Sequence, residues 1–162
     1  EGNTRGLFKG RDVVSLLTGE PEYLDPLKDE APNGWLVTGY PWYAIQTPEH
    51  KAFVAAYRKA FNDHPRLGSV VGYSSIKSLA AGMKKAKSTE TEKMIAAFSG
   101  LQVDTPFGKI TYRPEDHQST MGGYVGRTKN EGGKGVMVDF RYVDGAKVLP
   151  PGAETKKLRP AD

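Results

Sequence analysis

The segment PNGWLVTGYPWY, Pro32–Tyr43, decides how this chain can fold. Its part from 34 to 38 predicts a buried strand, because it is continuously apolar and ends in a β-branched threonine. Pro41 must end that strand, since proline has no N–H for a sheet and restricts the residue before it. Three large aromatic side chains are therefore held just beyond the strand's carboxyl end. They are Tyr40, Trp42 and Tyr43.

The position of these aromatic residues suggests two interpretations. Open α/β sheets bind ligands outside the carboxyl ends of their strands, and aromatic walls suit an organic solute. The same rings could equally pack in a core or in an interface. Residue types alone leave both interpretations open.

Composition narrows the class of protein. The 162 residues are enough for one domain with a core, and 38% apolar with 26% charged residues is a globular balance. The chain has no cysteine, which excludes disulfides, thiol nucleophiles and cysteine-held metals. The net charge of +4 comes from scattered lysines and arginines without interleaved aromatic residues, so no nucleic-acid site is expected. No apolar run approaches the ~20 residues that span a bilayer.

The remaining pattern predicts strands, then helices, then strands. Residues 12–18 predict a buried strand, 21–30 a short helix or turn-rich connector, and 48–62 and 67–86 two helices. A capping box of Thr89 and Glu92 opens a third helix that Gly100 ends. Strands are expected at 101–105, 109–112, 123–129 and 136–143, the last two as a hairpin. In helix 67–86, the apolar spacing predicts an inward stripe of Val71, Ile76, Leu79, Ala80 and Met83.

Sequence signals for catalysis are absent or incomplete. Gly72–Ile76 is close to a nucleophile elbow, but isoleucine stands where the last glycine belongs, and the segment lies in a predicted helix. Gly132–Gly135 suggests a phosphate loop, but Val136 replaces the serine or threonine and a strand follows. We therefore expect no catalytic residue, metal or cofactor. The three histidines are not in metal-ligand spacing and predict surface or capping groups. They are His50, His64 and His117. His117 alone has a second interpretation, as a group that lines the hinge.

Five stretches carry a family resemblance. In order, GEPEYLDPLKDEAPNGWLVTGYPW, EHKAFVAAYRKAF, PRLGSVVGYSSIKSLAAGMKKA, VDTPFGKITYRPEDHQS and YVGRTK resemble the carboxyl-terminal half of type I periplasmic solute-binding proteins. The subgroup is that of the leucine/isoleucine/valine-binding proteins of ABC importers. The resemblance runs from about Gly6 to about Pro150.

The resemblance implies an α/β fold of two Rossmann-like lobes, with the chain crossing between them and the solute in the cleft. The segments 34–41 and 105–118 look like the second and third crossovers. Residues 1–38 are expected in the second lobe, 39–112 in the first, 113–150 as return crossover and terminal hairpin, and 151–162 as a loosely packed tail. The strands at 12–18 and 34–38 lack obvious partners. We therefore expect broad exposed apolar surfaces, to be buried by a missing amino-terminal segment or a second copy.

The same resemblance suggests ligand-binding residues. Glu20 falls near the position where amino-acid-binding members hold the solute's ammonium group, although Glu22 could serve instead, and either could simply complement a helix dipole. Tyr40 and Trp42 would border the cleft mouth or the hinge. Tyr73 would face the cleft from the start of a helix, or pack in the core.

The expected function is solute binding for an ABC-type importer of amino acids or related small organic acids. Closure of the lobes would trap the solute, and the closed form would dock on a membrane permease. The full-length protein would be secreted to the periplasm, with its signal peptide outside this chain. Aromatic acids stay open as solutes because of the segment Tyr40–Tyr43. The alternatives are a cytoplasmic ligand-sensing regulator of the same fold and, with less support, a small α/β enzyme.

Overall fold

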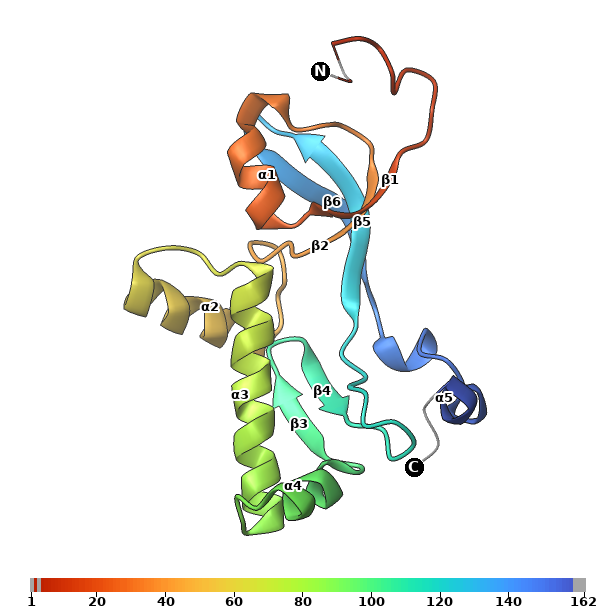
Figure 1. Cartoon of the computed structure of the whole chain (residues 1–162). Helices are drawn as coiled ribbons and strands as arrows, with labels where there is room; N and C mark the ends of the chain where they lie inside the picture. The colour runs from red at the N-terminus through yellow and green to blue at the C-terminus, as the bar shows by residue number, and fades with distance from the viewer. Residues whose placement is uncertain (1, 3, 159–162) are drawn as a thin grey trace.

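The computed structural model describes residues 2 and 4–158 and shows a mixed α/β architecture in two bodies (Figure 1). The first, the sheet body, holds a four-stranded sheet covered by the short helix α1. The second, the helical body, holds α2, α3 and α4 with a two-stranded hairpin. The α/β class expected from the sequence is confirmed. No helix within the described residues combines the length and apolar character needed to cross a membrane.

The sheet has the strand order β1-β2-β5-β6. β1 (Val14–Gly19) and β2 (Leu36–Gly39) run parallel, and β2 pairs antiparallel with β5 (Gly123–Asn130). β6 (Gly135–Val143) completes the expected hairpin with β5. The expectation that the two early strands lack partners is therefore wrong. The pairing joins β2 to a strand far along the chain, which no local pattern can indicate.

β1 forms an edge of the sheet instead of being buried. Its side chains Val14, Leu16 and Leu17 are 67%, 72% and 52% exposed. The prediction of a buried strand is wrong within this chain, because β1 has a neighbour on one side only. A parallel strand with exposed apolar side chains is unusual, since parallel sheets are normally covered on both faces.

The helix α1 (Pro21–Leu27) continues into a 3₁₀ turn, η1 (Lys28–Glu30), and packs on the sheet. Pro21 takes the first helical position, where its missing N–H costs nothing. Gly135 at the start of β6 leaves the room that Leu24 and Ala31 occupy, because a Cβ there would collide with both.

The helical body consists of α2 (Pro48–Phe61), α3 (Leu67–Ala86), α4 (Thr91–Phe98) and the hairpin β3 (Gln102–Thr105) and β4 (Gly108–Thr111). Figure 1 shows the hairpin lying along α3, with α4 across its lower end. The cap of α4 differs from the expectation. Glu90, rather than Thr89, is the N-cap, and its carboxylate accepts the backbone N–H groups of Glu92 and Lys93.

The buried face of α3 is a row of mostly small residues, Val70, Ser74, Ser78 and Gly82. The predicted inward stripe is wrong: Val71, Ile76, Leu79 and Met83 are 37–67% exposed, and Ala80 is exposed too. The small residues face inward because they allow close approach. A Cβ on Gly82 would meet the ring of Phe98 on α4.

Three connections cross between the bodies: residues 40–47, 112–122 and 144–151. The last contains the 3₁₀ turn η2 (Gly145–Lys147) and leads to α5 (Gly152–Leu158). Arg113 holds the segment before α5 by donating a hydrogen bond to the carbonyl of Pro150 at 2.7 Å. The same guanidinium forms an ion pair with Asp116. Where a loosely packed tail was expected, residues 152–158 therefore form a helix, and residues 159–162 lie outside the described residues.

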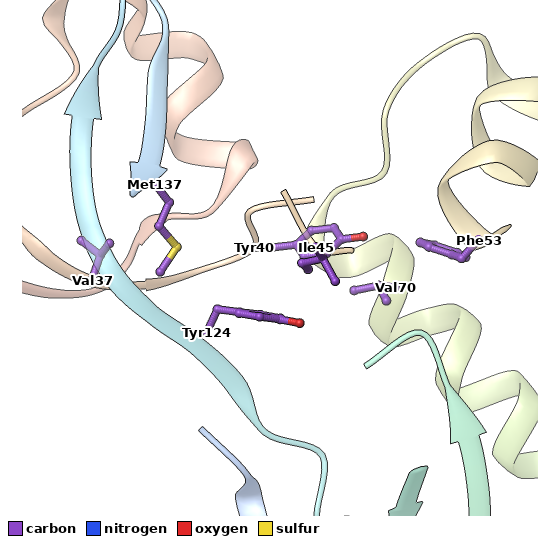
Figure 2. Close-up of a cluster of buried hydrophobic side chains, with 7 residues drawn as sticks. All are labelled: Val37, Tyr40, Ile45, Phe53, Val70, Tyr124 and Met137. Atoms are coloured by element: carbon purple, nitrogen blue, oxygen red, sulfur yellow. The ribbon is translucent and has the colours of Figure 1, made fainter. Parts of the chain in front are cut away.

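A buried apolar cluster crosses the junction between the bodies (Figure 2). Val37 and Met137 enter it from the sheet, and Phe53 and Val70 enter it from α2 and α3. Tyr40 and Ile45 of the first connection lie between them, together with Tyr124 of β5. A second small cluster, Leu101, Val103 and Ile110, forms the core of the helical body.

Candidate functional site

The candidate site lies where the parallel strands β1 and β2 end side by side. Gly19 and Gly39 are opposite each other in the register, and a Cβ on Gly39 would collide with the Gly19 backbone. Because both positions are glycine, the strands approach closely here, and Glu20 and Tyr40 follow them at the same edge. This edge faces the helical body, as the contacts below show.

Glu20 is 7% exposed and occupies the N-cap of α1, yet its side chain makes no capping hydrogen bond. Burial raises the pKa of this carboxyl from its ordinary 4.5 to about 7, and the nearby Glu22 contributes in the same direction. Glu20 at the N-cap and Glu22 in the first turn lie where a charge would complement the dipole of α1, so that alternative stays open beside the ligand-binding one. A buried carboxyl with a raised pKa is the kind of group that functional sites concentrate.

Glu22 reaches across to the helical body. Its Oε1 accepts a hydrogen bond from the backbone N–H of Gly68, at the start of α3, at 3.2 Å. Its Oε2 is buried without a hydrogen-bond partner among the described residues. One carboxylate oxygen therefore stays available at the junction, next to Glu20.

Tyr40 is fully buried, with its hydroxyl 2.7 Å from Nε2 of His50. Burial raises the pKa of Tyr40 strongly and lowers the pKa of His50 to about 4. Both groups are therefore neutral near pH 7, and they share one hydrogen bond whose donor is set by the tautomer of the imidazole. The expectation that His50 lies at the surface is wrong, since it is completely buried in the first turn of α2. Tyr40 itself packs in the junction cluster in this structure.

Trp42 is half-buried and stacks on the imidazole of His64, with ring centroids 4.7 Å apart and planes at 11°. His64 in turn contacts Asp25 of α1, Nε2 to Oδ2, at 2.8 Å. The neighbouring Tyr43 binds the backbone of Met137, donating to its carbonyl at 3.1 Å and accepting its N–H at 2.6 Å. The aromatic segment thus ties the first connection to both bodies.

Tyr73 lies elsewhere, on the side of α3 that faces α2. It is 45% exposed, its ring is 4.9 Å from that of Phe53, and Lys77 lies over it. With the apolar face of α2 it lines a hollow of about 570 Å³. The structure therefore brings together Glu20, Tyr40 and Trp42 at the strand ends and leaves Tyr73 apart from them.

Sequence reasoning missed Asp25 and treated His64 as a surface or capping group. The two belong to different bodies, so neither stands in a motif with the other. The one available signal in the sequence was the pair His64-Pro65. It prevents α2 from continuing and holds the histidine on a fixed loop.

The outer faces of α3 and α4 carry a broad apolar surface. Besides the four side chains of the mispredicted stripe, Tyr73 on α3 and Ile95 on α4 are 45% and 47% exposed. Contiguous apolar patches of this kind are rare on the surfaces of soluble monomers.

Comparison with known proteins identifies relatives of this architecture. The model of the family described as periplasmic binding protein matches residues 2–134. An ABC-type branched-chain amino acid transporter protein of Rhodopseudomonas palustris is 29% identical, with a TM-score of 0.71, over 85% of this chain and 37% of its own. A solute-binding protein of an ABC transporter from the same species, solved with 3,4-dihydroxybenzoic acid, is 27% identical, with a TM-score of 0.72 over 89% of this chain and 40% of its own.

A more distant structure shares the fold. The leucine-, isoleucine-, valine-, threonine- and alanine-binding protein of Brucella ovis, in a closed conformation, is 18% identical with a TM-score of 0.74, over 91% of this chain and 40% of its own. The chain therefore spans about two fifths of the length of these structures. No protein of curated function matches it.

Proposed function

Because the chain belongs to the periplasmic binding protein family, we propose that it forms one side of the solute cleft of an ABC importer's binding protein. The matched structures are ABC-transporter solute-binding proteins, which are not enzymes, and the family implies a periplasmic location. The solute proposed for this chain is an amino acid or a related small organic acid, aromatic acids included.

The observation that carries the proposal is Glu20, a buried carboxyl at the carboxyl ends of two parallel strands. Burying an acid without a partner costs stability, and a ligand ammonium or hydroxyl placed beside it would recover that cost. Glu22 supplies a second, partly unpaired carboxylate, and Trp42 supplies an aromatic wall next to both strand ends.

The proposed mechanism is closure of two lobes. Residues 1–38 and 113–150 would belong to one lobe and 39–112 to the other, with the tail beyond. The three connections between the bodies would absorb the rotation, because a hinge needs only a few residues that change their backbone angles. The closed form would then dock on the membrane permease.

The exposed apolar face of α3 and α4 and the free edge of β1 are proposed to pack against an amino-terminal segment. Relatives of the fold contain more than twice the length of this chain, which is enough to supply both a covering layer and a neighbouring strand. A second copy of the chain is the competing occupant. Light scattering distinguishes the two occupants. A protein covered by its own amino-terminal segment would be a monomer, whereas a face covered by a second copy would give a dimer.

The experiment joins this chain to the amino-terminal part of the Rhodopseudomonas palustris protein that is 29% identical to it. Solutes are then titrated into the joined protein by calorimetry. Leucine, 4-hydroxybenzoate and 3,4-dihydroxybenzoate form the panel. At least one is expected to bind. If the solute carries an ammonium group, Glu20→Gln weakens binding at least tenfold, the loss of about one charge-assisted hydrogen bond. A folded protein that binds no member of a wider metabolite panel contradicts the proposal.

A further inference from the structure

Side chains of α1 touch the loop between α2 and α3, apart from the three connections that join the bodies. Nε2 of His64 lies 2.8 Å from Oδ2 of Asp25, and the two side chains are 25% and 30% exposed. This contact therefore sits at the rim of the junction. Separating it would expose little apolar surface, so it can open and close without unfolding either body.

The histidine is oriented from two directions. Trp42, on the first connection, stacks flat against its ring. Pro65, fully buried, follows it in the chain and fixes the backbone of the loop. A stacked ring on a fixed backbone loses little conformational entropy when it binds Asp25, so the contact is preorganised.

Both imidazole nitrogens face carboxylates. Nδ1 lies 3.2 Å from Oδ1 of Asp63, whose Oδ2 accepts a hydrogen bond from Arg66 at 2.8 Å. A neutral imidazole has one N–H, whereas the imidazolium has two and satisfies both carboxylates. With His64 charged, the two aspartates and the two cations balance. With it neutral, Asp25 and Asp63 face each other across the ring with only Arg66 to offset them.

A second link lies beside the first. Glu22, one turn before Asp25 on α1, binds the N–H of Gly68 at the start of α3. The two contacts place one side of α1 against the beginning of α3 and the loop before it. They connect the same two bodies whose closure the proposed function requires.

We propose that Asp25 and His64 form a clasp that holds the sheet body against the helical body, with Trp42 as its positioning residue. The inference rests on the proposed function in one respect, since it assigns the clasp to the closing motion of the lobes. Asp25 and His64 in contact close the clasp, and removing either side chain's polar group opens it. Asp25 and His64 lie at the rim of the junction, whereas Trp42 belongs both to the clasp and to the aromatic wall of the proposed solute site.

The test measures the separation of the bodies directly. The chain has no cysteine, so Asp29→Cys on η1 and Lys59→Cys on α2 give two unique, exposed sites for spin labels. Pulsed electron spin resonance without solute should show one narrow distance near pH 5.5. Asp25→Asn or His64→Gln should raise the ratio of separated to docked molecules about threefold to tenfold, the range for a partly exposed charged pair.

Two further arms separate a clasp from a general loss of structure. The double variant should match the single variants, because either change removes the whole interaction. Asp104→Asn is the control, since its partner Lys109 lies within the helical body at 3.9 Å.

An unchanged distance distribution in both Asp25→Asn and His64→Gln overturns the proposal. If one of these variants fails to fold, the other decides. Because no solute is present, failure of the calorimetric panel leaves the clasp standing. If the joined protein binds a solute but the distance between the spin labels does not respond to the substitutions, the clasp is refuted and the proposed function stands.

Discussion

Replacing Glu20 by glutamine should make the protein more stable at alkaline pH and change little at acid pH. The folded state holds the pKa of Glu20 at about 7, above its ordinary 4.5, so folding favours the protonated form. The carboxyl therefore costs nothing below about pH 4.5. As the pH rises, the unfolded chain ionises first, and the cost grows until the folded form ionises as well, near pH 7. At 1.36 kcal/mol for each pH unit, the full difference is about 3 kcal/mol.

Glutamine is close in shape and cannot ionise, so the variant escapes this cost. At pH 8 we expect Glu20→Gln to raise the melting temperature by roughly 6–12 °C, and at pH 4.5 to leave it nearly unchanged. Unfolding is followed by tryptophan fluorescence. His50 changes stability in the opposite sense, because its lowered pKa removes stability as the pH falls from 6.5 towards 4. The contribution of His50 is the same in the parent and in Glu20→Gln. It therefore cancels when the melting temperatures of the two proteins are compared.

The matched control is Glu22→Gln, which removes a carboxylate that already holds the N–H of Gly68. At pH 8 it should gain clearly less stability than Glu20→Gln, because Glu22 is the smaller cause of the raised pKa of Glu20. A difference between Glu20→Gln and the parent that is the same at pH 4.5 and pH 8 would refute the reasoning. It would show that the carboxyl is solvated in the folded state.

Three other substitutions test the packing, each measured by urea unfolding at pH 7. Tyr40→Phe leaves the buried Nε2 of His50 without its hydrogen-bond partner and should cost about 1–3 kcal/mol; a loss below 0.5 kcal/mol would contradict the buried pair. Gly82→Leu should cost about 1–3 kcal/mol by displacing Phe98, whereas Gly72→Ala, which has open space, should gain up to ~1 kcal/mol. Ile76→Lys should change stability by less than ~0.5 kcal/mol and reduce binding of an apolar dye; a large destabilisation would show that its side chain is buried.

Local signals predicted the elements well. The helix at 67–86 has the bounds expected from its apolar periodicity, and the β5–β6 hairpin follows from its turn residues. Which face of the long helix is buried was predicted wrongly. Hydrophobic spacing assumes that large apolar residues turn inward, but Ser74, Ser78 and Gly82 do so here because neighbouring elements approach closely.

The site was predictable only in part. Glu20 and Trp42 could be inferred from their position after the strands, because a strand's end is a local property. The burial of Tyr40 and His50, and the contact of Asp25 with His64, depend on how distant elements meet. The exposed stripe on α3 also lies beyond local prediction: its pattern is that of a buried helix, but these side chains are exposed within the described residues.

The account depends on two bodies that come together around a solute. The most direct measurement is small-angle X-ray scattering of the joined protein, recorded with and without a saturating concentration of the solute found by calorimetry. We predict a smaller radius of gyration in the bound state. A radius that does not change, in a protein shown to be saturated, would contradict closure and with it the central claim.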